Sequence, residues 1–177
     1  QFGDLAGSSI SAFNFETDWK YIINFENWRP TAGLKLDYSS GDSETGDSRL
    51  NSFNPMFVNP GTYSLAAVNT PVNLLSFHPS LLLFPNKKWL INLEYAFFYR
   101  SADEDGFYSP PRIQTRMADG ITARRLGDVI GLYVQYTYNR HLSFDIRSSY
   151  FIPANFIEES GPSESIFQFA STLTLTF

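Results

Sequence analysis

The sequence predicts an all-β fold, an antiparallel transmembrane β-barrel to which this chain contributes a seven-strand portion. Three observations lead to this prediction. Aromatic residues make up 17% of the chain and charged residues only 18%, whereas about a quarter of a soluble domain is usually charged. Seven segments alternate apolar and polar residues, as half-buried strands do. The connections between these segments are alternately short and long, as they are in outer-membrane barrels.

Each segment places its apolar residues on one face. In the fifth segment, for example, Ile130 and Leu132 alternate with Gly131 and Tyr133. No segment shows a 3.6-residue apolar stripe, so we expect no helix in the chain. The seven predicted strands cover residues 9–21, 31–39, 74–84, 89–100, 129–139, 142–152 and 167–177.

The connections predict which ends of the strands face each side of the membrane. Three are short turns, and the three that alternate with them are long. Outer-membrane barrels have short periplasmic turns and long outer loops, so ending the last strand at the periplasm puts every short turn on the expected side. The short connections are 24–29, 85–88 and 140–141, and the long ones are 41–71, 101–128 and 153–162.

Aromatic residues on the apolar faces gather near the two ends of the strands. Rings with an apolar body and a polar tip prefer the headgroup level of a bilayer, which predicts two aromatic girdles. We therefore expect the outer membrane of a Gram-negative bacterium, with membrane lipid and lipopolysaccharide around the protein. The alternative is that these rings fill the core of a soluble sandwich. The predicted girdle residues are Trp19, Tyr21, Trp89, Tyr138 and Phe177 at the periplasmic end and Tyr38, Tyr99 and Tyr150 at the outer end.

Composition excludes several other classes of protein. No run approaches the roughly 18 apolar residues of a membrane-spanning helix. A net charge of −5 is opposite to the basic footprint of nucleic-acid binding, so we expect no nucleic-acid partner. The absence of cysteine excludes disulfides and thiolate chemistry. The length suits one domain, and we assign 1–177 to a single barrel domain.

Several stretches resemble the alginate-export family of outer-membrane barrels. They are GLKLDYSSGD (33–42), FNPMF (53–57), NLLSFHPSL (73–81), HLSFDI (141–146) and YFIPANFIEESGP (150–162). The alternating final segment with its terminal Phe177 is also similar to the C-terminal assembly signal of outer-membrane proteins. The resemblance implies a passive conduit for polysaccharide or smaller polar solutes, in a large barrel of which this chain is the C-terminal portion. The remaining strands, from upstream sequence or another chain, would pair with the two outermost segments.

Charged residues at inward positions are candidates for contact with a permeant. The alternative is that they brace the wall through cross-strand pairs. These candidates are Lys20, Lys35, Asp37, Glu94, Arg100, Asp145 and Arg147.

The second long loop carries a group of arginines. If that loop folds inward, their guanidinium groups would form an anion-attracting constriction, since arginine binds carboxylates bidentately. The alternative is a solvated loop that contacts lipopolysaccharide phosphates. The four residues are Arg112, Arg116, Arg124 and Arg125.

The sequence offers little for catalysis or cofactor binding. The acidic stretch 42–47 has oxygen donors for calcium but lacks the spacing of an EF-hand loop, so we assign no metal ligand and leave calcium open. The two histidines, His78 and His141, have no neighbouring serine and carboxylate in a triad-like arrangement. We expect no enzyme, no catalytic residue and no cofactor. The alternatives are an outer-membrane lipase or protease, a barrel that scaffolds a complex, and a soluble lipid-binding barrel.

Overall fold

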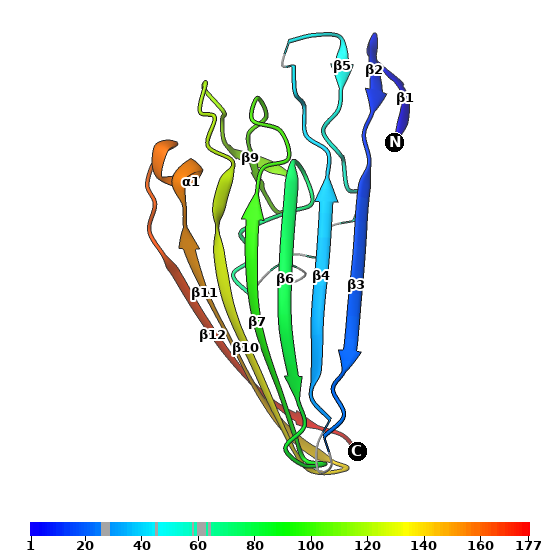
Figure 1. Cartoon of the computed structure of the whole chain (residues 1–177), viewed down its shortest axis with the longest axis vertical. Helices are drawn as coiled ribbons and strands as arrows, with labels where there is room; N and C mark the ends of the chain where they lie inside the picture. Colours follow the sequence, from blue (N-terminus) through cyan, green and yellow to red (C-terminus); the bar gives the residue numbers. More distant parts are fainter. Residues whose placement is uncertain (26–28, 45, 58, 60–62, 64) are drawn as a thin grey trace.

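The computed structural model describes residues 1–25, 29–44, 46–57, 59, 63 and 65–177. Most of the strand residues form one seven-stranded antiparallel sheet whose order follows the sequence (Figure 1). This confirms the predicted all-β antiparallel fold. The strands, in sheet order, are β3 (Asn14–Ile22), β4 (Thr31–Ser39), β6 (Leu74–Leu83), β7 (Trp89–Tyr99), β10 (Arg125–Asn139), β11 (Leu142–Pro153) and β12 (Ile166–Leu175).

Within the described residues the sheet stays open. The strands β3 and β12 are its two edges, and each has a neighbour on one side only. The sheet is therefore part of a barrel wall and not a closed barrel.

The strand register places the alternating residues on the predicted faces. Leu132 lies opposite Leu93 and Ser148, whereas Tyr133 lies opposite Asn92 and Arg147. Directly opposed residues share a face, so the apolar set is continuous across the sheet. We call this apolar face the outer face, and the polar face, on which the long loops pack, the inner face.

Large apolar side chains are exposed over the whole outer face. Trp19 is 61% exposed, Phe15 61% and Leu173 63%, although a soluble protein would bury such a surface. The exposed rings include the predicted periplasmic-end girdle. Among the described residues, no helix is both long and apolar enough to cross a membrane.

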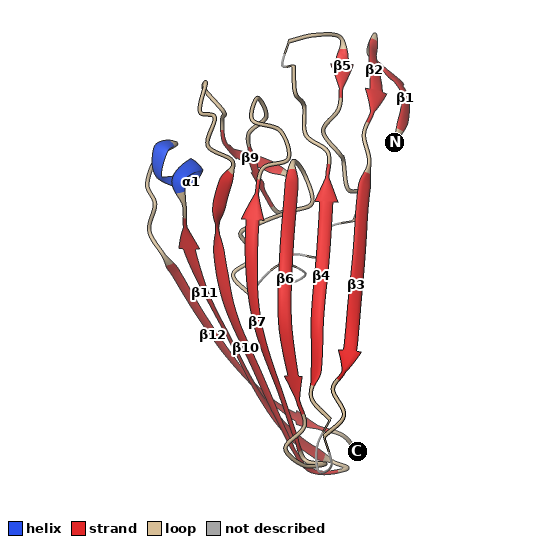
Figure 2. Cartoon of the chain, in the orientation of Figure 1, coloured by secondary structure: helices blue, strands red, loops and turns tan. Residues whose placement is uncertain are grey.

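The two ends of the sheet differ as the connections predicted. The short turns and the C-terminus lie at one end, and the long loops with their small elements lie at the other (Figures 1 and 2). A second sheet of β1 (Phe2–Leu5), β2 (Ser8–Ser11) and β5 (Arg49–Leu50), a hairpin of β8 (Phe107–Ser109) and β9 (Ile113–Arg116), and helix α1 (Asn155–Glu159) form in or beside these loops.

Three details of the prediction are wrong. A helix does form, because Phe156 and Ile157 of the five-residue α1 are buried beneath the loops, and one turn is too short to show a stripe. The first predicted strand is interrupted, since residues 9–11 pair with β1 and β5 while β3 begins at Asn14. Strand β10 begins at Arg125, ahead of the predicted residue 129.

The hydrophobic core lies at the loop end of the inner face. It joins side chains of the strands to the first two long loops and to α1, so these loops fold over the sheet. Its buried members are Tyr63, Leu74, Ala96, Phe98, Leu126, Val129, Phe151, Phe156 and Ile157.

Candidate functional site: the inner face of the sheet

Charged side chains on the inner face occur in pairs. Lys20, Lys35 and Arg147 each have a carboxylate within salt-bridge distance, either two residues away on the same strand or diagonally across on the next strand. This geometry suits charges that brace a polar wall, and contact with a permeant stays a prediction. The pairs are Lys20–Asp18 (Nζ to Oδ2, 2.9 Å), Lys35–Glu16 (Nζ to Oε1, 3.1 Å) and Arg147–Asp145 (Nε to Oδ1, 3.1 Å).

Asp37 anchors the first long loop to β4. Its carboxylate is 1% exposed and accepts a hydrogen bond from the Tyr63 hydroxyl at 2.6 Å and one from Asn14 Nδ2 at 3.1 Å. The Lys35 ammonium lies 5.2 Å from the centroid of the Tyr63 ring. Burial, reinforced by the neighbouring Asp37 carboxylate, raises the pKa of the Tyr63 phenol, so that it remains a donor. The loop thus descends onto the inner face at Tyr63.

Ser76, His78 and Glu94 form a hydrogen-bonded chain that the sequence analysis missed. His78 Nδ1 lies 2.9 Å from Glu94 Oε1, and His78 Nε2 lies 3.0 Å from Ser76 Oγ. Glu94 comes from the next strand, but the spacing of Ser76 and His78 already put them on one face. The arrangement is that of a serine–histidine–carboxylate triad.

The Ser76–His78–Glu94 arrangement is buried and therefore out of reach of a substrate. Ser76 is fully buried and His78 is 3% exposed. The rings of Tyr63 and Phe98 lie 6.2 Å and 5.3 Å from the His78 ring. A catalytic nucleophile must be able to contact its substrate, and Ser76 is too deeply buried to do so. The hydrogen bonds among Ser76, His78 and Glu94 therefore brace the wall and do not form an accessible active site.

Arg100 does not line open space. Its side chain is 1% exposed, and its guanidinium lies 3.9 Å from the centroid of the Phe156 ring. Burial lowers the pKa of this guanidinium, although arginine remains charged. Its N–H groups hold the second long loop by donating to backbone carbonyls of Asp103, Asp105, Ile121 and Ala123.

The four loop arginines are directed to different partners. Arg116 Nη2 donates to the carbonyl of Pro162 at 2.5 Å, and Arg124 Nη2 lies 3.2 Å from Asp103 Oδ1. Arg125 pairs with Tyr99 in the strand register and therefore lies on the outer face. There its Nη2 is 2.6 Å from Asp128 Oδ2. Arg112, between β8 and β9, lines a cavity of about 730 Å³ among the outer loops. An anion-attracting constriction stays a prediction.

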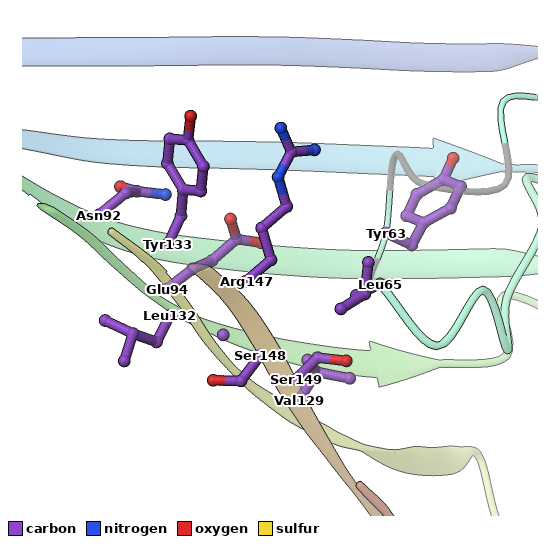
Figure 3. A pocket seen from close by; sticks show the side chains of 11 residues that line it. Tyr63, Leu65, Asn92, Glu94, Val129, Leu132, Tyr133, Arg147, Ser148 and Ser149 are labelled. Carbon is purple, nitrogen blue, oxygen red and sulfur yellow. The ribbon is translucent and has the colours of Figure 1, made fainter. Parts of the chain in front are cut away.

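Two adjoining pockets hollow the inner face. Their volumes are about 390 Å³ and 330 Å³, and both are lined by Asn92, Glu94 and Tyr133. Figure 3 shows Arg147 and Tyr133 rising from the sheet beside the first pocket, with Tyr63 of the loop at its far end. We call the two pockets together the inner groove. Within the part of the chain that the structure describes, no group of three or more histidines or carboxylates could hold a metal ion.

The remaining candidates from the sequence have local partners in the loops and turns. In the acidic stretch, Asp42 Oδ1 accepts from the Glu44 amide and Asp47 Oδ1 from the Arg49 amide, as turn residues do. Residue 45 lies outside the described residues. His141 Nδ1 lies 2.9 Å from the carbonyl oxygen of Thr176, which ties the last short turn to the end of the chain.

Comparison with known protein families decides the assignment. The family model described as alginate export matches residues 1–171, nearly the whole chain. The chain belongs to the alginate export family. Membership confirms the resemblance noted in the sequence and makes the open sheet part of an outer-membrane β-barrel of an export family. Comparison with curated proteins gives no match.

Proposed function

We propose that this alginate export family protein is a passive channel through the outer membrane of a Gram-negative bacterium, for polysaccharide or other polar solutes. The observation that carries the proposal is the contrast between the two faces of one sheet. The outer face exposes large apolar side chains, such as Phe77, Leu93 and Ile130, as a lipid-facing wall does. The inner face carries paired charges and the inner groove, as the wall of a water-filled lumen does.

The long loops support a channel that is narrowed from its outer end. The first loop reaches the inner face at Tyr63, and the second is held over the core by Arg100. Loops folded into a lumen restrict its width and set which solutes pass. The second pocket of the inner groove lies farther from the loops, because its lining includes Thr31, Leu82 and Leu90, at the ends of β4, β6 and β7 nearest the short turns.

Membrane lipid and lipopolysaccharide are the proposed surroundings of the outer face. Near the loop end, Tyr99 and Tyr150 lie on this face, and Arg125 lies opposite Tyr99 in the register. Aromatic rings with a nearby cation suit the boundary between acyl chains and phosphate-bearing headgroups.

An outer-membrane enzyme is the rival class, and the Ser76–His78–Glu94 chain is the observation that would favour it. The burial of Ser76 opposes this reading, because no ester or peptide bond reaches its hydroxyl. A serine hydrolase would react with a fluorophosphonate probe at Ser76, and Ser76→Ala would abolish that reaction. A channel would show neither effect.

Electrical recording from the whole protein in a planar lipid bilayer tests the proposal. A passive channel gives stepwise, ohmic conductance without any energy source, and Ser76→Ala keeps this conductance. A purified, folded protein that never conducts, yet hydrolyses lipid esters or peptides, would overturn the proposal in favour of the enzyme.

A further inference from the structure

We infer that the outer face carries a binding site for the phosphorylated lipid A headgroup of lipopolysaccharide, centred on Arg125 at the outer end of β10. This inference rests on the proposed position of the chain in the outer membrane, and it names the lipid that this part of the outer face holds. It starts from the distribution of charge on that face. Among the described residues of the seven strands, the only charged side chains on the outer face are Arg125 and Asp128.

This pair of charges lies at the level of the headgroups in the outer leaflet. From Asp128 to Asn139, beside the last short turn, β10 spans roughly 28 Å along the membrane normal at the usual residue spacing and tilt of a barrel strand. The apolar band of an outer-membrane barrel is about 25 Å tall. Asp128 therefore lies at the outer boundary of this band, and Arg125 lies beyond it.

Asp128 holds the guanidinium group of Arg125 in place. The Asp128 residue is 7% exposed, and its Oδ2 accepts hydrogen bonds from Arg125 Nη2 at 2.6 Å and from the Tyr95 hydroxyl at 2.8 Å. The Arg125 side chain is still 46% exposed, and among the described residues only its Nη2 has a partner. The N–H groups on Nε and Nη1 are therefore available to a ligand. Two N–H groups of one planar guanidinium can bind a phosphate bidentately.

The surroundings of Arg125 suit the rest of a lipid molecule. The Tyr99 ring lies opposite Arg125 in the register, and Tyr150 and Phe167, a directly opposed pair, are 40% and 66% exposed farther along the same face. Aromatic rings of this kind occupy the boundary between headgroups and acyl chains. Closer to the short turns the outer face continues with apolar residues such as Leu93, which acyl chains would cover. The order along the face is thus cation, aromatic rings and apolar surface, which matches phosphate, sugar and acyl chains.

The site is complete within this chain, because β10 lies between β7 and β11 in the sheet (Figure 1). The strands that must still pair with β3 and β12 are therefore not needed to form it. A lipid that contacts the loop end of the sheet belongs to the outer leaflet, which consists of lipopolysaccharide in a Gram-negative bacterium. Lipid A combines phosphates on a sugar headgroup with several acyl chains. Phosphatidylglycerol, which has a phosphodiester on a small headgroup, is the phosphate-bearing lipid of the opposite leaflet.

Native mass spectrometry of the whole protein in detergent tests this site with three probes. They are bisphosphorylated lipid A, the same lipid without its phosphates, and phosphatidylglycerol. We expect bisphosphorylated lipid A to bind about tenfold more tightly than either of the other lipids, the effect of one charge-assisted hydrogen-bonded contact.

Arg125→Gln should remove this tenfold advantage. Glutamine can still donate a hydrogen bond to Asp128, but it carries no charge for a phosphate. Arg140→Gln is the matched control, because Arg140 lies in the short turn 140–141 at the opposite end of the sheet and contacts His141. We expect this control to bind lipid A as the unaltered protein does.

The possible outcomes separate this site from the proposed channel. Equal binding of lipid A with and without phosphates by the unaltered protein would overturn the inference, whatever the variants do. An equal loss in Arg125→Gln and Arg140→Gln would also overturn it, as would binding of phosphatidylglycerol as tight as that of lipid A. Conductance is recorded from the same samples. A protein that binds lipid A through Arg125 but never conducts would overturn the channel and leave the lipid site standing.

Discussion

At the scale of single residues, buried polar side chains hold the outer loops in place. The Asp105 carboxylate accepts from the Ser52 hydroxyl at 2.5 Å, from the Asp42 amide at 3.1 Å and from the Tyr108 hydroxyl at 2.8 Å. It thereby connects both of the first two long loops. Burial raises the pKa of the Tyr108 phenol, with Asp105 adding to the effect, so the phenol keeps its proton and its hydrogen bond.

Removing the Tyr63 hydroxyl should loosen the first loop. Tyr63→Phe takes the closest donor from the buried Asp37 carboxylate, and an under-satisfied buried group costs about 1–3 kcal/mol. We expect faster hydrogen exchange in residues 46–57 of the folded protein and a lower unfolding temperature. Tyr38→Phe is the control, since the Tyr38 ring lies on the outer face and stacks on Phe13. Equal exchange in both variants would show that Tyr63 does not anchor the loop.

Sequence alone could predict which residues face inward, but not which of them are buried beneath the long loops and α1. Arg100 alternates correctly with Tyr99, yet its burial depends on Phe156 and on loop carbonyls that no local pattern reveals. Tyr63 lies in a loop without periodicity, so its contact with Asp37 was not predictable. The pairing of Ser76 with His78 was within reach, because a spacing of two puts both on one face of a strand.

At the scale of elements, most of the strands could be predicted from the alternation of apolar and polar residues. The segment 31–39 was predicted with the bounds that β4 has, since Leu34 and Leu36 alternate cleanly with Gly33 and Lys35. The short strand β5 was not predictable, because its partner is distant in sequence: Arg49 of β5 pairs with Ser9 of β2. A two-residue strand has too few positions to show any period.

The two faces of β10 should respond differently to charge. Leu132→Arg places a cation on the lipid-facing side near mid-membrane, where it costs about 2–4 kcal/mol. Gln135→Arg places the same side chain on the inner face opposite Asp145, where it finds water and a carboxylate. We expect the folded fraction, measured by heat-modifiable migration on gels after refolding into detergent, to fall for Leu132→Arg only. Similar folding of both variants would contradict the assignment of the faces.

At the scale of the whole molecule, the two open edges dominate the energetics. In lipid no water satisfies the exposed N–H and C=O groups of β3 and β12, and each such group costs several kcal/mol. Joining the two edges directly would pair strands that run in the same direction, since seven alternating strands begin and end alike. Bacterial outer-membrane barrels are antiparallel throughout, with an even number of strands.

We therefore predict that further strands, from the same polypeptide or another chain, pair with β3 and β12 in the assembled barrel. Residues 1–177 refolded in detergent should give oligomers or an incompletely protected sheet, with rapid amide exchange along both edge strands. Central strands such as β7 serve as the internal control, because both of their ladders are complete. A stable monomeric barrel with protected β3 and β12 would contradict the prediction.

The strict correspondence between chain order and sheet order also bears on how such barrels change over evolutionary time. Every neighbour in the sheet is the next long strand in the sequence, so no connection crosses another strand. Duplication or loss of one hairpin at an outer loop would widen or narrow the pore by two strands, with all flanking pairings and the sidedness of every turn preserved. Gain of a single strand would instead move every later turn and loop to the opposite side of the membrane. Pore diameter in this architecture is thus free to vary, but in steps of two strands.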